Sequence, residues 1–205
     1  MARRSLLTAK TRHQLFGIPE DPEQLTRFYT LTRADHDLIR TRRRAENRLG
    51  LAVHVALLRH PGQGWIDGSV LPESFINWLA EQLAMPGIDL TAYARHRKAR
   101  SVHHQTAMNH LGLRPFQAGN MDAASSLARE AAFATDHGLD ILHALCAGLR
   151  EQQLVLPSAD TLERLALKGR AAARRHAATS IVEALSADQR AALQELLTND
   201  PALGQ

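Results

Sequence analysis

The sequence contains a single cysteine, Cys146, among its 205 residues. One thiol excludes a disulfide within the chain and also excludes the paired-thiol zinc sites of ribbons and fingers. No apolar run approaches the roughly 20 residues that a membrane-spanning helix needs. Residues 1–8 carry positive charge, but no long apolar segment follows, so they do not resemble a secretory signal. We therefore expect a protein of the reducing cytoplasm without a membrane partner.

Catalytic motifs are also absent from the sequence. It has no Walker phosphate loop, no GxSxG nucleophile motif and no GxGxxG dinucleotide motif. Its carboxylates are scattered, and none forms a pair suited to acid and base catalysis or to two metal ions. Cys146 falls between Leu145 and Leu149 on an apolar helix face, where a free thiol is usually inert. These absences predict a chain that is not an enzyme and holds no cofactor.

Strand signals are nearly absent, because β-branched and polar residues do not alternate, whereas start and stop signals of helices recur. Thr8 and Gly17 bracket a short helix, and Asp21 followed by Pro22 is a strong helix start. The fold class is therefore predicted to be all-α. Helices are expected at about 9–16, 22–29, from 33, and at 44–58, 73–83, 98–111, 122–136, 139–152, 160–178 and 187–198.

Two helical subdomains are expected, each large enough for a core of its own. The Arg114-Pro115-Phe116 step should end the first, and Gly119 with Asn120 makes a plausible hinge. From Asp122 onward, alanine and leucine dominate the composition. The predicted subdomains are residues 1–117 and 118–205, with helix-turn-helix units in the fold.

Positive charge is concentrated in the first part of the chain. Residues 1–60 hold 12 basic and 6 acidic side chains, a net charge of +6, whereas residues 121–205 hold 8 basic and 11 acidic ones, a net of −3. Nearly all the basic residues are arginines, whose planar guanidinium groups bind phosphates and guanine edges with two hydrogen bonds. This asymmetry indicates a polyanionic partner for the first half.

The densest basic segment lies where one short helix is followed by a longer one. The longer helix is polar at its start and apolar afterwards, as expected of a helix-turn-helix whose second helix enters the major groove with its first turns. Arginine suits guanine and phosphate, and asparagine suits adenine. A solvated helix end is the alternative. We call the following residues the first basic cluster: Arg40, Arg42, Arg43, Arg44, Asn47 and Arg48.

A second basic segment begins another expected helix. DNA contact and a solvated face are both open here. A metal site is disfavoured, because adjacent histidines diverge by about 100° on a helix and no HExxH motif accompanies them. We call the following residues the second basic cluster: Arg97, Lys98, Arg100, His103 and His104. Arg3 and Arg4 complete the expected set of DNA contacts.

A weaker basic stretch lies in the expected helix at 160–178. Arg164, Lys168 and Arg175 form one stripe, and Arg170 and Arg174 form another. Several of these cations are near the C-terminal end of the helix, where they interact favourably with the helix dipole and need no ligand to explain them. The structural interpretation is therefore preferred to DNA binding at this stretch.

Four segments, in this order along the chain, resemble the N-terminal region of transposases of the Tn-three family. These transposases act on replicative transposons that form cointegrates. The segments are MARRSLLT at 1–8, RRRAENRLGLAVHVALLRHPG at 42–62, YARHRKARSVHHQTAMNHLGLRPF at 93–116 and LSADQRAALQELL at 185–197.

The resemblance implies that helix-turn-helix-type domains bind the terminal inverted repeats of the transposon. It also implies a separate catalytic domain with three carboxylates and divalent metal, which the chain, ending at Gln205, would lack. The expected protein is then a non-catalytic DNA-binding fragment of a bacterial transposase. Its expected partners are double-stranded DNA at transposon ends and the remainder of the transposase, and the full-length protein could form a homodimer. The rival hypotheses are a helical protein-interaction module and an enzyme whose site has no recognisable motif.

Overall fold

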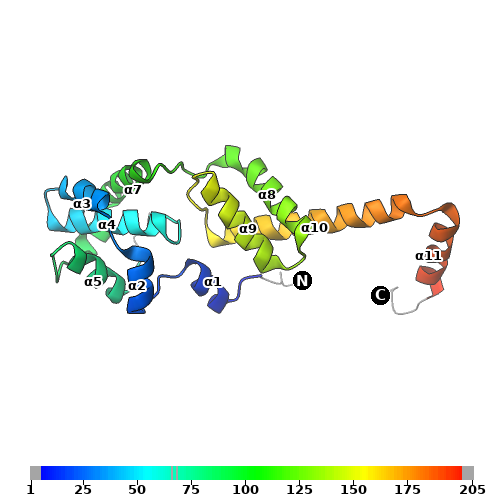
Figure 1. Cartoon of the computed structure of the whole chain (residues 1–205), viewed down its shortest axis with the longest axis horizontal. Helices are drawn as coiled ribbons and strands as arrows, with labels where there is room; N and C mark the ends of the chain where they lie inside the picture. Colours follow the sequence, from blue (N-terminus) through cyan, green and yellow to red (C-terminus); the bar gives the residue numbers. More distant parts are fainter. Residues whose placement is uncertain (1–5, 66, 68, 200–205) are drawn as a thin grey trace.

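Residues 6–65, 67 and 69–199 are described by a computed structural model, which has two helical lobes and a projecting arm (Figure 1). Among the described residues there is no β-strand, only an isolated bridge between Arg114 and Leu154, so the all-α prediction is confirmed. The helices are α1 (Ala9–Phe16), α2 (Pro22–Tyr29), α3 (Arg33–Arg40), α4 (Ala45–Arg59), α5 (Glu73–Gln82), α6 (Thr91–Arg95), α7 (Arg97–Leu111), the 3-10 turn η1 (Ala118–Asn120), α8 (Met121–Ala134), α9 (Gly138–Glu151), α10 (Ala159–Ala184) and α11 (Ala187–Asn199).

The first lobe consists of α2 to α7, arranged around α4. Every residue of α4 from Leu49 to Leu58 is buried, because α2, α3, α5, α6 and α7 all pack against this helix. Trp65 holds the following loop on the core: it is 3% exposed, and its Nε1 donates to the carbonyl of Ser69 at 2.8 Å. The first lobe is therefore a set of short helices that surrounds one central, apolar helix.

The second lobe packs α8, α9 and the first half of α10 against one another. Small residues allow close approach here, since a Cβ atom at Gly169 would lie 2.6 Å from the backbone of Ala128 on α8. Leu7, which precedes α1, is part of this core, and the backbone amides of Leu6 and Leu7 donate to the carboxylate of Glu163 on α10. The start of the chain therefore belongs to the second core, although the first lobe follows it in sequence.

The two lobes contact each other directly. Arg150 Nη2 donates to the carbonyl of Pro61 at 2.7 Å, and the amide of Leu156 donates to the carbonyl of Gly62 at 2.8 Å. Val155 is part of the first core, whereas its neighbours Leu154 and Leu156 are part of the second. The division at residue 117 stays a prediction. The packing also shows that the chain segments before and after the first lobe both contribute residues to the second core.

Two helices differ from the sequence expectation. Helix α6 was not expected, because five residues are too few to produce a helical period; Asp89 Oδ1 accepts from the amide and hydroxyl of Thr91 at its start. Helix α10 continues to Ala184 instead of ending near 178, since no glycine or proline interrupts the sequence after Gly169 until Pro201.

The exposed second half of α10, residues 174–184, and α11 form the projecting arm (Figure 1). None of the helices in the described part of the chain combines the length and the apolar character that a lipid bilayer would require of a spanning segment.

Candidate nucleic-acid interface

The first basic cluster surrounds the turn between α3 and α4. Helix α3 begins with a reciprocal cap, in which Thr32 and Asp35 each bind the backbone amide of the other. The turn itself is fixed by backbone bonds, because the amides of Thr41 and Arg42 donate to the carbonyls of Leu38 and Ile39. The sequence prediction of two helices joined by a short arginine-rich turn is therefore confirmed.

Three arginines of the first basic cluster are exposed at this turn. Arg40 lies 3.5 Å from Asp37, and Arg44 lies 4.0 Å from Glu46; both pairs face solvent, where such contacts contribute little to stability. No ion pair of Arg43 exists within the described part of the chain. These guanidinium groups are accessible to an external anion.

The other members of the first basic cluster are half-buried. Arg48 Nε donates to the carbonyl of Arg42 at 2.7 Å and thereby closes the turn. Arg42 Nη2 lies 3.4 Å from the hydroxyl of Thr106 on α7. Asn47 is half-buried in the first turn of α4. From Leu49 to Leu58, α4 is buried, so on this side of the helix the first turn is the part that can reach an external partner.

The second basic cluster divides into exposed and buried members. Arg97 and Lys98 are exposed at the start of α7, which the ring of His96 caps by accepting from the amide of Ala99. Lys98 precedes Thr106, the contact of Arg42, by eight residues or about 12 Å along the helix axis. The exposed residues at the start of α7 are therefore well separated from the point at which the first basic cluster contacts this helix.

The remaining members of the second basic cluster lie in the interior. Arg100 is 6% exposed and His103 is 5% exposed, while His104 is half-buried. The Tyr93 hydroxyl lies 2.8 Å from His103 Nδ1, and the two rings stack with centroids 5.5 Å apart. Arg100 and His103 therefore support the fold and lie outside the exposed surface.

Burial changes the protonation of this histidine group. It lowers the pKa of His54 to about 3, with smaller contributions from the neighbouring His104, His103 and Arg100. It also lowers the pKa of His103 to about 4, and Arg42 adds to this shift. The pKa of His104 is lowered by burial as well. At neutral pH these three rings are uncharged, so they do not add positive charge to the surface.

A buried carboxylate that the sequence pattern did not predict, Asp35, lies close to the first basic cluster. Asp35 is 0% exposed, and its Oδ1 lies 2.8 Å from both Arg59 Nη2 and His110 Nε2. Burial alone would raise the pKa of Asp35, but hydrogen bonds from Arg59, Thr32 and His110 outweigh burial and hold that pKa far below its usual value. The only signal in the sequence was the Thr32 and Asp35 capping pair, which also fits an exposed helix start.

Several sequence-predicted residues lie elsewhere. Arg3 and Arg4 fall outside the described residues. In the weaker stretch, Arg164, Lys168 and Arg175 are exposed on α10, whereas Arg174 forms an ion pair with Asp136 of the α8–α9 loop. Within the described part, no three histidine, cysteine, aspartate or glutamate side chains are grouped so as to hold a metal ion.

The comparison with known families gives the class of the protein. Residues 6–169 match the family model described as a domain of unknown function, DUF4158, so the chain belongs to this family. Over 96% of its length the chain is 36% identical to the transposase for transposon Tn501 of Pseudomonas aeruginosa. It is also 33% and 31% identical, again over 96% of its length, to the Escherichia coli transposases for transposons Tn3926 and Tn21.

The resemblance to Tn-three-family transposases is therefore confirmed over essentially the whole chain. In each of these alignments, the chain covers 20% of the relative. The chain thus spans about a fifth of the length of these transposases.

Proposed function

We propose that the chain is the DNA-binding part of a Tn-three-family transposase and that it binds duplex DNA at the terminal inverted repeats. The observation that carries this proposal is the first basic cluster, in which Arg40, Arg43 and Arg44 stay exposed around a turn fixed by the buried part of α4. A rigid, positively charged projection of this kind suits the grooves and backbone of DNA. The transposase relatives support the same class of partner.

Within this proposal the exposed side chains have different tasks. Arg40, Arg43 and Arg44 bind backbone phosphates and supply affinity. Asn47, half-buried in the first turn of α4, reads base edges. Arg97 and Lys98 form a separate backbone contact at the start of α7, while Arg100 and His103 position that helix. We assign strand cutting and joining to a separate part of the transposase, outside the fifth of the relatives that the chain matches.

Footprinting tests this proposal on fragments that carry the ends of the transposon encoding the chain, with an unrelated duplex of equal length as control. We expect protection confined to the terminal repeats. If roughly five to eight phosphates are neutralised, the logarithm of affinity should fall with the logarithm of salt concentration at a slope of about −4.5 to −7. Absence of protection, or an affinity that does not respond to salt, would contradict the proposal.

A second candidate function is contact with the remainder of the transposase through the projecting arm. Ile181 and Val182 on α10 are 62% and 48% exposed, and Leu193 and Leu196 on α11 are 45% and 69% exposed. Apolar side chains of this number on one arm are typical of protein contacts. Ile181→Ser should weaken association of the chain with the rest of the transposase without changing DNA affinity, as measured by sedimentation of the mixed proteins.

A further inference from the structure

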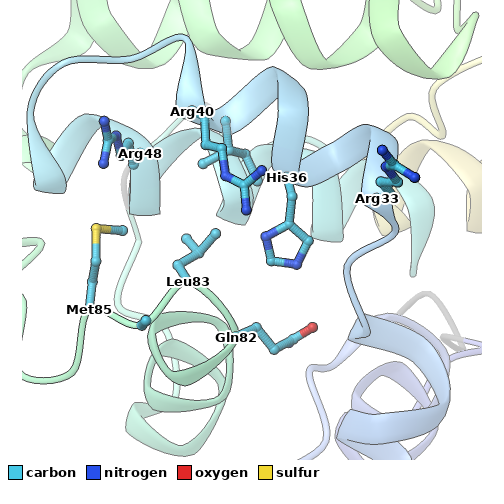
Figure 2. A pocket seen from close by; sticks show the side chains of 9 residues that line it. Arg33, His36, Arg40, Arg48, Gln82, Leu83 and Met85 are labelled. Atoms are coloured by element: carbon cyan, nitrogen blue, oxygen red, sulfur yellow. The ribbon is translucent and has the colours of Figure 1, made fainter.

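A pocket of about 570 Å³ lies beside the first basic cluster, between α3, the start of α4 and the end of α5 (Figure 2). Figure 2 shows four basic side chains along the side formed by α3 and α4, and shows Leu83 and Met85 on the opposite side. The basic lining residues are Arg33, His36 and Arg40 of α3 and Arg48 of α4. Neither Arg33 nor His36 was selected by the sequence analysis.

Among the described residues, no carboxylate lines this pocket. Arg40 has an exposed ion pair with Asp37 at 3.5 Å, and no carboxylate of the described residues lies within ion-pair distance of Arg33 or Arg48. Arg33 and Arg48 therefore give the pocket a positive charge that no carboxylate of the described residues neutralises. An anion can enter without displacing an internal ion pair of Arg33 or Arg48.

The basic side chains follow a line along the pocket. Positions 33, 36 and 40 are separated by three and four residues, so they share one face of α3. Arg33 and Arg40 are about 10 Å apart along the helix axis. Arg48 extends the line from the next helix, where the bond from its Nε to the carbonyl of Arg42 fixes the side chain. Such a line matches an extended chain of negative charges better than a single compact anion.

The opposite side of the pocket combines carbon surface with one glutamine that is held by hydrogen bonds. Gln82 has its polar atoms occupied, because its Oε1 accepts from the amide of Leu31 at 2.7 Å and its Nε2 donates to two backbone carbonyls at 3.2 Å. Leu83 and Met85 supply carbon surface beside it. A deoxyribose ring can pack on this surface while the arginines bind the adjoining phosphates.

We propose that this pocket holds a phosphodiester segment of one DNA strand, with Arg33 and His36 as DNA contacts. The proposal rests on the proposed function and makes α3, whose exposed face lines the pocket, the helix that lies along the backbone. Because phosphates are the same at every step, this contact supplies affinity without base preference. Sequence reading stays with the first turn of α4.

The test measures affinity of Arg33→Gln for a 30-base-pair duplex carrying the transposon end and for an unrelated duplex of the same length. Loss of one phosphate contact should weaken both equally, by about eightfold at 0.1 M salt, and should reduce the salt slope by about 0.9. Arg33→Lys keeps the charge and should retain most of the affinity. The matched control is Arg129→Gln, which removes one exposed arginine of α8 and should change affinity less than about twofold.

Neutral methylphosphonate linkages, introduced one at a time into the end duplex, identify the phosphate. A methylphosphonate at one position should weaken DNA binding by the wild-type protein. The same linkage should not weaken binding by Arg33→Gln any further. The pocket proposal is overturned if Arg33→Gln binds like Arg129→Gln, or if the linkage effects are unchanged in it. If the wild-type protein binds neither duplex, the proposed function itself fails. Circular dichroism and thermal melting establish that each variant is folded.

Discussion

His110 Nε2 lies 2.8 Å from Asp35 Oδ1, although the two residues are 75 positions apart in the chain. Arg59 Nη2 reaches the same oxygen at 2.8 Å, and the other carboxylate oxygen accepts from the amide of Thr32 at 2.7 Å. One buried carboxylate thus joins α3, α4 and α7. It fixes the helix that carries Arg33 and Arg40 on the core, and so it sets the position of the proposed DNA-binding surface.

Replacing Asp35 with asparagine should destabilise the first lobe. The substitution keeps the shape but removes the charge, which leaves Arg59 and His110 in a largely buried position without their partner. We expect a loss of about 2 to 4 kcal/mol, below the largest values for buried pairs because Arg59 is partly exposed. Urea unfolding at pH 7.5 measures it. Asp37→Asn, on the exposed face of α3, is the control and should stay within about 0.5 kcal/mol of the wild type.

The buried histidines predict acid sensitivity well above the range in which carboxylates titrate. The pKa values of His54 and His103 in the folded protein, about 3 and about 4, are below the ordinary value of 6.5, so the unfolded chain binds more protons below pH 6.5. Stability should be greatest above pH 6.5 and fall as the pH decreases, by up to about 1.4 kcal/mol per pH unit for each ring. Urea unfolding at pH 7.5, 6 and 5 follows the loss.

His54→Leu is the matched variant for this pH dependence. Neither ring nitrogen of His54 has a hydrogen-bond partner among the residues that the structure describes, so leucine should fill the site without breaking such a bond. In His54→Leu, the free energy of unfolding should decrease less between pH 7.5 and pH 5 than in the wild type. The difference is the contribution of the His54 ring. Asp35 does not interfere, since its lowered pKa keeps its contribution intact until the pH falls below about 4. Equal stability of the wild type at pH 7.5 and 5 would refute this prediction.

Gly169→Ala should destabilise the second lobe. The added methyl group would lie 2.6 Å from the backbone of Ala128, so α8 and α10 must move apart. We expect a cost of about 1 to 3 kcal/mol, partly offset by the better helix propensity of alanine. Thermal melting measures it. Gly119→Ala, where nothing lies within 4 Å of the added atom, is the control, and an equal effect of both substitutions would argue against close helix packing.

Asn47→Ala and Arg43→Gln should separate base reading from backbone binding. Asn47 is half-buried in the first turn of α4, beside the exposed arginines, and its loss should reduce the preference for the transposon end over an unrelated duplex by about tenfold. Arg43→Gln should weaken both duplexes by the same factor. Competition measured by fluorescence anisotropy compares the two. A change of preference in Arg43→Gln with none in Asn47→Ala would reverse the assigned roles.

Local signals predicted much of the helical structure. Thr8 and Asp21 cap the helices that they were expected to begin, since a cap depends on residues three positions apart. The burial of Arg100 and His103 was missed, although Ala107 and Met108 mark an apolar face that reaches both when extended backwards at helical spacing. The high density of charged residues in this segment favoured a surface position, whereas the helical period of its apolar residues indicates burial. The pocket could not be predicted from the sequence. It forms because the end of α5 packs opposite α3, and a contact between helices so far apart in the chain leaves no local sequence pattern.

The contact of Leu6 and Leu7 with Glu163 has a practical result for dissecting this protein. If the chain were cut between residues 117 and 118, α1 would remain on the N-terminal fragment. The C-terminal fragment would then lack the apolar residues of α1 and its preceding segment that complete its core. The later fragment would regain its missing part only if a peptide covering residues 6–16 were supplied with it. Topologically, the first lobe is an insertion within the second.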